Sequence, residues 1–352
     1  MITYAMMAIL VICMLLMITL GLKIDKSKNV FMSVDDTAFL RGVWCIVIIF
    51  VHTPAAYQNR IQDLIGSFAY VGVTFFFLTS GYGLRYSVEN KMNYGKRFWR
   101  NRLPSILIPA VIANVIYTLV SGLKNSWSQI TFWSFININA WVKGLLLLYF
   151  LFWLIYIIAP KFIKTGVWQD ILICSIILCL SLLERFTSIH AFWGWVVEPL
   201  GFGYGIVIAR NKNRIQIWLQ NKWIFKCIVF LLVSLILGVA YLRFKPVFFF
   251  GDYLIKMLLG IALTVLIFEI LCGFRVGNIF NLFLSKISYE IYLIHGAVFA
   301  FVSFVKSDLD SGVYILISII FSVAFAWVIH KCTQPCINSL KGISNNESID
   351  CK

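Results

Sequence analysis

The chain has 352 residues, of which 61% are hydrophobic and only 13% are charged, and its formal net charge is +15. Soluble domains are roughly 45–50% apolar, so this composition excludes an ordinary soluble protein and predicts an integral membrane protein. The positive charge does not indicate a nucleic-acid partner, because lysine and arginine accumulate on the cytoplasmic loops of membrane proteins. We therefore expect the lipid bilayer, and no nucleic acid, as the environment of the chain.

Eleven mainly apolar segments have about the length that a membrane-spanning helix needs. They are 2–22, 38–57, 66–84, 103–122, 141–160, 169–184, 194–209, 223–242, 253–272, 288–305 and 312–332. The first segment lacks a basic start and a small-residue cleavage site, so we interpret it as a retained span rather than a signal peptide. The sequence therefore predicts an all-α polytopic membrane protein.

The distribution of basic residues predicts the orientation of these spans. If the loop after the first span is cytoplasmic, the inner side carries 22 lysines and arginines, whereas the outer loops carry six. Such a bias places the N-terminus outside and the C-terminus inside.

Five ionisable residues fall inside predicted spans: His52, Glu198, Glu269, Glu290 and His295. A charged or titratable group in a bilayer is costly and marks a functional site by default, but it can also be a packed, hydrogen-bonded side chain that steadies the bundle. Both interpretations stay open for these residues, and only His52 has a sequence context that adds information.

The segment "RGVWCIVIIFVH" begins with Arg41 and ends with His52. In a helix the imidazole would lie roughly 16 Å deeper than the guanidinium. Pro54 follows two residues later and weakens the helix there. An imidazole in such a place is suited to take a proton from a hydroxyl group or to accept an acyl group. A histidine in a membrane also needs a partner that fixes its tautomer, and Glu198 is our candidate.

A basic cluster follows the 66–84 segment. Lys96, Arg97, Arg100 and Arg102 lie within seven residues, and in a helix Arg97 and Arg100 would share a face. On a cytoplasmic loop such a cluster commonly serves only to anchor the topology. Guanidinium groups at this spacing also suit the phosphates of a nucleotide-bearing donor, so both roles stay open.

A metal site is not expected. The stretch "HKCTQPC" brings His330, Cys332 and Cys336 close together in sequence. A structural zinc site needs four ligands, and the sequence offers no fourth nearby.

Several motifs, in this order and at this spacing, resemble the membrane-bound acyltransferase-3 family. They are the Arg41–His52 pair, "GVTFFFLTSGYGL" at 72–84, "RFWR" followed by Leu103-Pro104, and "ISYEIYLIHG" at 287–296. The resemblance covers roughly residues 36–332. It implies a ten-helix bundle, an acyl-coenzyme A donor bound from the cytoplasm, and transfer of the acyl group to a hydroxyl of a surface or exported glycan.

The resemblance also implies roles for individual residues. Arg41 and His52 match the family's paired essential positions, and Arg97 and Arg100 match its donor-side arginines, beside which we place Arg102. The late motif contributes Ser288, Tyr289, Tyr292 and His295, whose role the resemblance leaves open. We accordingly expect His52, Arg41 and Glu198 to be catalytic and the three arginines to bind the donor.

The expected protein is thus an O-acetyltransferase of polysaccharide in the bacterial plasma membrane, with acetyl-CoA as donor. An extra N-terminal helix and loop would occupy 1–35, the acyltransferase domain 36–332, and a short cytoplasmic tail 333–352. The alternative is a glycan exporter or flippase without acyl transfer, although such proteins often show internal repeats that this sequence lacks.

Overall fold

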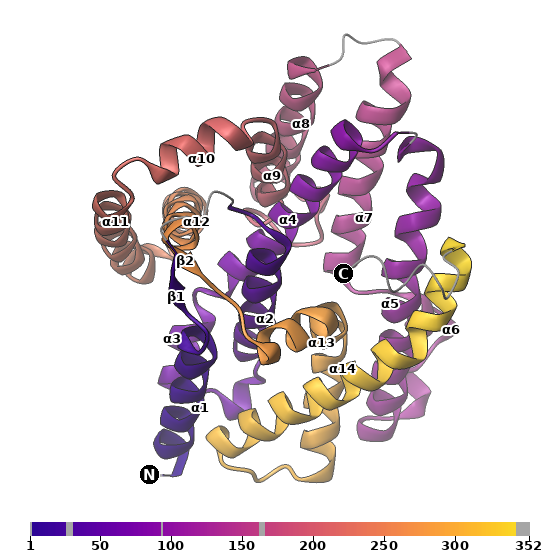
Figure 1. Cartoon of the computed structure of the whole chain (residues 1–352). Helices are drawn as coiled ribbons and strands as arrows, with labels where there is room; N and C mark the ends of the chain where they lie inside the picture. The colour runs from indigo at the N-terminus through magenta and orange to yellow at the C-terminus, as the bar shows by residue number, and fades with distance from the viewer. Residues whose placement is uncertain (1, 26–30, 93, 162–165, 343–352) are drawn as a thin grey trace.

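The computed structural model describes residues 2–25, 31–92, 94–161 and 166–342, and within them the chain is almost entirely helical (Figure 1). The helices are α1 (Ile2–Thr19), α2 (Val34–Val51), α3 (Arg60–Gly66), α4 (Ala69–Asn90), α5 (Phe98–Lys124), α6 (Phe132–Ile136), α7 (Ala140–Trp153), α8 (Val167–Phe186), α9 (Leu200–Arg210), α10 (Lys212–Gln220), α11 (Trp223–Phe244), α12 (Lys256–Gly273), α13 (Ile279–Val305) and α14 (Ser311–Lys341). π-helical turns extend α7 over Leu154–Ile158 and precede α12 over Phe250–Ile255. Two-residue strands β1 (Lys23–Ile24) and β2 (Phe274–Arg275) pair antiparallel.

The predicted all-α polytopic class is confirmed. In the part of the chain that the structure describes, nine helical segments are long and apolar enough to cross a membrane. Helix α2 has 18 residues but carries Asp35, Asp36 and Arg41. Helix α9 has 11 residues and therefore spans only about 16 Å, roughly half of the hydrocarbon core. Each predicted span contains helical residues, but the helix within 194–209 is too short to cross the membrane.

The chain between α8 and α9 is a folded loop, which is why the predicted span 194–209 is cut short. Trp193 and Gly194 have φ values of 52° and 95°, which a helix does not contain. The buried carboxylate of Glu184 on α8 accepts hydrogen bonds from the backbone N–H groups of Phe192 at 2.7 Å and Gly194 at 2.6 Å. Apolar composition does not reveal such a loop, because its backbone is satisfied by one distant side chain.

Helix α9 is held tightly against α4, and these two helices make the most extensive contact in the bundle. Gly201 and Gly205 face the backbone carbonyls of Thr74 and Leu78, with which a methyl group on either glycine would collide. Small residues four apart allow two helix backbones to approach closely in a membrane. This contact fixes the position of α9 against α4.

Helix α13 forms the centre of the fold, because it packs against α2, α5 and α14. Helix α14 crosses the bundle diagonally, and its C-terminal half reaches α5 (Figure 1). It continues through Pro335 as far as Lys341 and ends at Gly342, whose φ is 71°. The first nine residues of the predicted tail 333–352 are therefore helical, and they bring Lys341 back to the bundle.

Helix α1 is joined to the core at both of its ends. The side chains of Asn278 and Asn281 donate to the carbonyl oxygen of Met17 at 3.1 and 2.7 Å. At the other end, the Thr3 hydroxyl donates to Asp310 at 2.5 Å. These contacts satisfy carbonyls that the end of a helix leaves free, so the extra N-terminal helix is an integral part of this bundle.

Candidate active site

His52 lies where α2 ends. The helix stops at Val51 instead of continuing to residue 57, because Pro54 has no N–H to donate to the carbonyl of Phe50. The buried side chain of Gln62 takes that place and donates to the Phe50 oxygen at 2.5 Å. The proline thus ends α2, as the sequence predicts, and His52 lies at the helix terminus.

The orientation of the His52 imidazole follows from the same helix end. The backbone N–H of His52 bonds to Ile49, three residues back, which leaves the carbonyl of Ile48 without its usual helical donor. Nδ1 of His52 lies 3.0 Å from that oxygen. Because a carbonyl oxygen can only accept, Nδ1 carries the proton, and Nε2 of the neutral ring keeps a lone pair.

His52 is exposed rather than buried, because it borders two cavities. The first, which we call the outer cavity, has a volume of about 600 Å³ and is lined among others by His52, Tyr117, Lys124, Lys143, Tyr292 and His295. The second, the side cavity, has a volume of about 480 Å³ and is lined among others by His52, Tyr70, Trp195, Glu198, Tyr241 and Lys256. Small molecules in either cavity could therefore contact the imidazole.

His295 is the neighbour that the structure brings to His52. The two ring centroids are 4.7 Å apart, and the rings are inclined by 50°. His295 is buried on α13 and its ring also contacts Phe299. The sequence analysis listed both histidines but had no means of pairing residues 243 positions apart.

Glu198 borders the same cavity as His52 but binds a different side chain. Its carboxylate forms an ion pair with Nζ of Lys256 at 2.5 Å, and Lys256 also lies over the ring of Tyr70. Among the described residues, the imidazole of His52 is oriented by the hydrogen bond that its Nδ1 donates to the Ile48 carbonyl. The expected tautomer-fixing contact from Glu198 thus has no bond to support it, and Lys256 is a cavity residue that no sequence motif had indicated.

Arg41 borders a third cavity, at the opposite end of α5 from Lys124. This inner cavity has a volume of about 310 Å³ and is lined among others by Arg41, Arg102, Trp141, Tyr149, Tyr292 and Lys341. Among the residues that the structure describes, its lining holds three cationic side chains and no carboxylate. Such a lining favours an anionic ligand.

The three arginines expected at the donor side are separated by the structure. Arg102 lines the inner cavity and donates to the hydroxyl of Tyr94 at 2.8 Å. Arg97 and Arg100 are exposed and do not line it. Lys341 lines it instead, and no local sequence signal had indicated that a tail residue would return to this point.

The late motif on α13 lies between the inner and outer cavities. Ser288 and Tyr289 border the inner cavity, His295 borders the outer one, and Tyr292 borders both. The motif therefore extends from the lining of one cavity to the lining of the other.

A family model described as an acyltransferase domain matches residues 36–331. The chain belongs to the acyltransferase-3 family. This confirms the resemblance, and together with the helix content it makes the protein a multi-pass membrane acyltransferase. A comparison with curated proteins and one with solved structures found no match.

Two further ionisable residues of the acyltransferase spans form ion pairs away from the three cavities. Glu290 contacts Nδ1 of His330 at 2.8 Å, and Glu269 contacts Nζ of Lys226 at 3.3 Å. Within the described residues, no group of three or more histidine, cysteine, aspartate or glutamate side chains could hold a metal ion. His330 is thus a partner of a glutamate in this structure.

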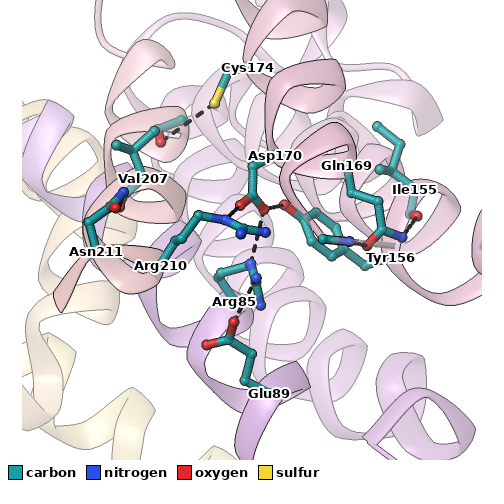
Figure 2. Close-up of polar contacts among 12 residues, drawn as sticks. Arg85, Glu89, Ile155, Tyr156, Gln169, Asp170, Cys174, Val207, Arg210 and Asn211 are labelled. Carbon is teal, nitrogen blue, oxygen red and sulfur yellow. Dashed lines mark hydrogen bonds and ion pairs between the residues drawn. The ribbon is translucent and has the colours of Figure 1, made fainter. Parts of the chain in front are cut away.

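The structure also shows a polar cluster that the sequence analysis missed. Asp170 on α8 forms ion pairs with Arg85 of α4 and Arg210 of α9, and it accepts a hydrogen bond from Tyr156 (Figure 2). Arg85 and Asp170 are both buried, and Arg85 also reaches the more exposed Glu89 at 2.7 Å. No local sequence signal indicates this cluster, because Asp170 lies on a different helix from both arginines.

Proposed function

We propose that the protein is an O-acetyltransferase that moves an acetyl group from cytoplasmic acetyl-CoA to a hydroxyl of a surface or exported polysaccharide, in the bacterial plasma membrane. The observation that carries the proposal is the hydrogen bond between Nδ1 of His52 and the Ile48 carbonyl, because it leaves Nε2 as the basic nitrogen. Family membership supports the class of reaction, and the cavities on which His52 borders support its place.

In this proposal His52 is the general base. The hydroxyl oxygen of the acceptor attacks the carbonyl carbon of the thioester, and Nε2 of His52 takes the hydroxyl proton. A carbon–oxygen bond forms, the carbon–sulfur bond breaks, and the proton passes to the departing coenzyme A sulfur. Transient transfer of the acyl group to the imidazole is the second mechanism that fits the same geometry.

The donor would enter through the inner cavity. Arg41, Arg102 and Lys341 offer three cations for the phosphates of acyl-CoA, and planar guanidinium groups bind such oxygens in pairs. A volume of about 310 Å³ is at the low end for a ligand pocket, so it suits the acyl-pantetheine arm and the phosphates attached to it rather than the whole donor. The exposed Arg97 and Arg100 would then contact the nucleotide outside the cavity.

The acceptor would enter from the other end of the bundle. The outer and side cavities both reach His52, and both are lined by polar and aromatic side chains, which suit a sugar hydroxyl. Glu198 and Lys256 would contribute to this acceptor side as a neutral ion pair. The acyl group and the sugar hydroxyl would thus meet at the imidazole.

The experiment that tests this function compares wild type with His52→Ala and His52→Gln at equal membrane levels. Loss of the base should lower O-acetylation of the surface glycan by about 10²–10⁴ in rate, with the amount of glycan unchanged. The measurement is NMR and mass analysis of the purified glycan. An exporter would show less surface glycan with its acetylation unaltered, and that result would overturn the proposal.

A further inference from the structure

The inner and outer cavities approach each other closely inside the bundle. On α5, Ile106 lines the inner cavity and Ala110 lines the outer cavity. These residues are one helical turn apart, which corresponds to about 6 Å along the helix axis. On α13 the same side chain, Tyr292, borders both cavities. The barrier between the two ends of the protein is therefore about one side-chain layer thick at this point.

Aromatic side chains make up that layer. Tyr292 and Trp141 are both buried, and their ring centroids are 4.9 Å apart. Tyr289 lies beside Trp141 at 6.2 Å. Its hydroxyl donates to the carbonyl of Ile106 at 2.8 Å, so it is anchored to α5.

Tyr292 is held less firmly than Tyr289. Its hydroxyl contacts Oδ1 of Asn139 at 3.5 Å, the outer limit for a hydrogen bond. Its ring also contacts the ring of His295, at a centroid distance of 5.7 Å. Of the two tyrosines, Tyr292 thus loses the weaker hydrogen bond when it turns aside.

The indole N–H of Trp141 is a donor that a group entering this layer could satisfy. It is buried and has no hydrogen-bond partner among the described residues, although Trp141 lines the inner cavity. A buried donor without a partner costs about 1–3 kcal/mol. A carbonyl oxygen that reaches this layer from the inner cavity would remove that cost.

We propose that Tyr292, closed against Trp141, is a gate that seals the bundle between the inner and outer cavities and turns aside when the acyl-thioester arm passes toward His52. That Tyr292 seals the bundle can be tested without an acyl donor. That the acyl-thioester arm passes it rests on the proposed function. Removing the Tyr292 ring should join the two cavities into one path across the membrane. An aromatic constriction of this kind blocks water and ions when closed.

The experiment measures proton entry into liposomes that contain the purified protein and the pH-sensitive dye pyranine, without any acyl donor. Tyr292→Ala should raise the rate of proton entry by about tenfold or more over wild type, and Tyr292→Phe should stay sealed because it keeps the ring. Tyr149→Ala is the matched control, since Tyr149 is equally buried but lines the inner cavity alone. Size-exclusion profiles and thermal midpoints establish that the variants are folded.

If a folded Tyr292→Ala variant admits protons no faster than wild type, the gate hypothesis is wrong, even if acetyl transfer proceeds normally. Equal leakage by Tyr149→Ala would also overturn it, because enlargement of one cavity would then explain the leak. Leakage confined to Tyr292→Ala supports the gate. The outcome is independent of the His52 variants, so failure of the gate and failure of the proposed function are separate results.

Discussion

The imidazole of His52 lies against that of His295, with the ring centroids 4.7 Å apart, yet the two histidines differ in their surroundings. His52 is exposed and borders both the outer and the side cavity, whereas His295 is buried on α13 and borders the outer cavity alone. One base is sufficient for proton transfer from a hydroxyl. We therefore propose that His52 is the base and that His295 is a positioning residue that supports its ring.

This assignment predicts unequal effects of substitution. His295→Phe keeps an aromatic ring against His52, so the turnover rate of acetyl transfer should fall by about tenfold or less, whereas His52→Gln should lower it by at least about 10². The rate at saturating acetyl-CoA measures both. Equal losses in the two variants, at equal thermal stability, would contradict the division of roles.

The inner cavity predicts which basic residues hold the donor. Arg102→Ala and Lys341→Ala should each raise the KM for acetyl-CoA by about tenfold or more, because each removes a charged hydrogen bond to phosphate. With S-acetylpantetheine, which lacks the nucleotide and its phosphates, the variants should match wild type. Arg60→Ala, an exposed arginine on α3, is the control for loss of charge alone. A KM defect that persists with S-acetylpantetheine would exclude phosphate binding.

The buried cluster around Asp170 predicts a large effect on stability. Asp170→Asn leaves Arg85 and Arg210 without their shared carboxylate, and breaking a buried ion pair costs about 3–5 kcal/mol. Thermal unfolding in detergent should show this loss. Glu89→Gln is the matched control, because Glu89 contacts the same arginine but its side chain is 45% exposed. Similar midpoints for wild type and Asp170→Asn would mean that the cluster does not stabilise the fold.

The basic-residue bias predicts the orientation of the membrane domain. Met92, at the inner end of α4, is 94% exposed, and Ser128 lies in an exposed turn after α5. In a cysteine-free background, Ser128→Cys should react with an impermeant thiol reagent added to intact cells, whereas Met92→Cys should react only after the membrane is opened. The reverse labelling pattern would place Arg102 and the inner cavity outside.

The sequence by itself determined the features that depend on local spacing and composition. The positions of the helical segments follow from runs of apolar residues, because a backbone in lipid must satisfy its own hydrogen bonds. The separation of Arg41 from His52 follows from the rise of a single helix, and α2 is indeed continuous from Val34 to Val51. The motif order also identified the family over nearly the same residues that the family model matches.

Only the tertiary structure decided which side chains meet. Glu198 pairs with Lys256, Lys341 returns to the cavity that Arg102 lines, and Asp170 joins two arginines from other helices. Each contact joins residues 40 or more positions apart, on helices whose neighbours are set by packing rather than by local sequence. Apolar composition indicates that a helix lies in the membrane. It does not indicate which helices pack against it, and that packing decides where each polar partner lies.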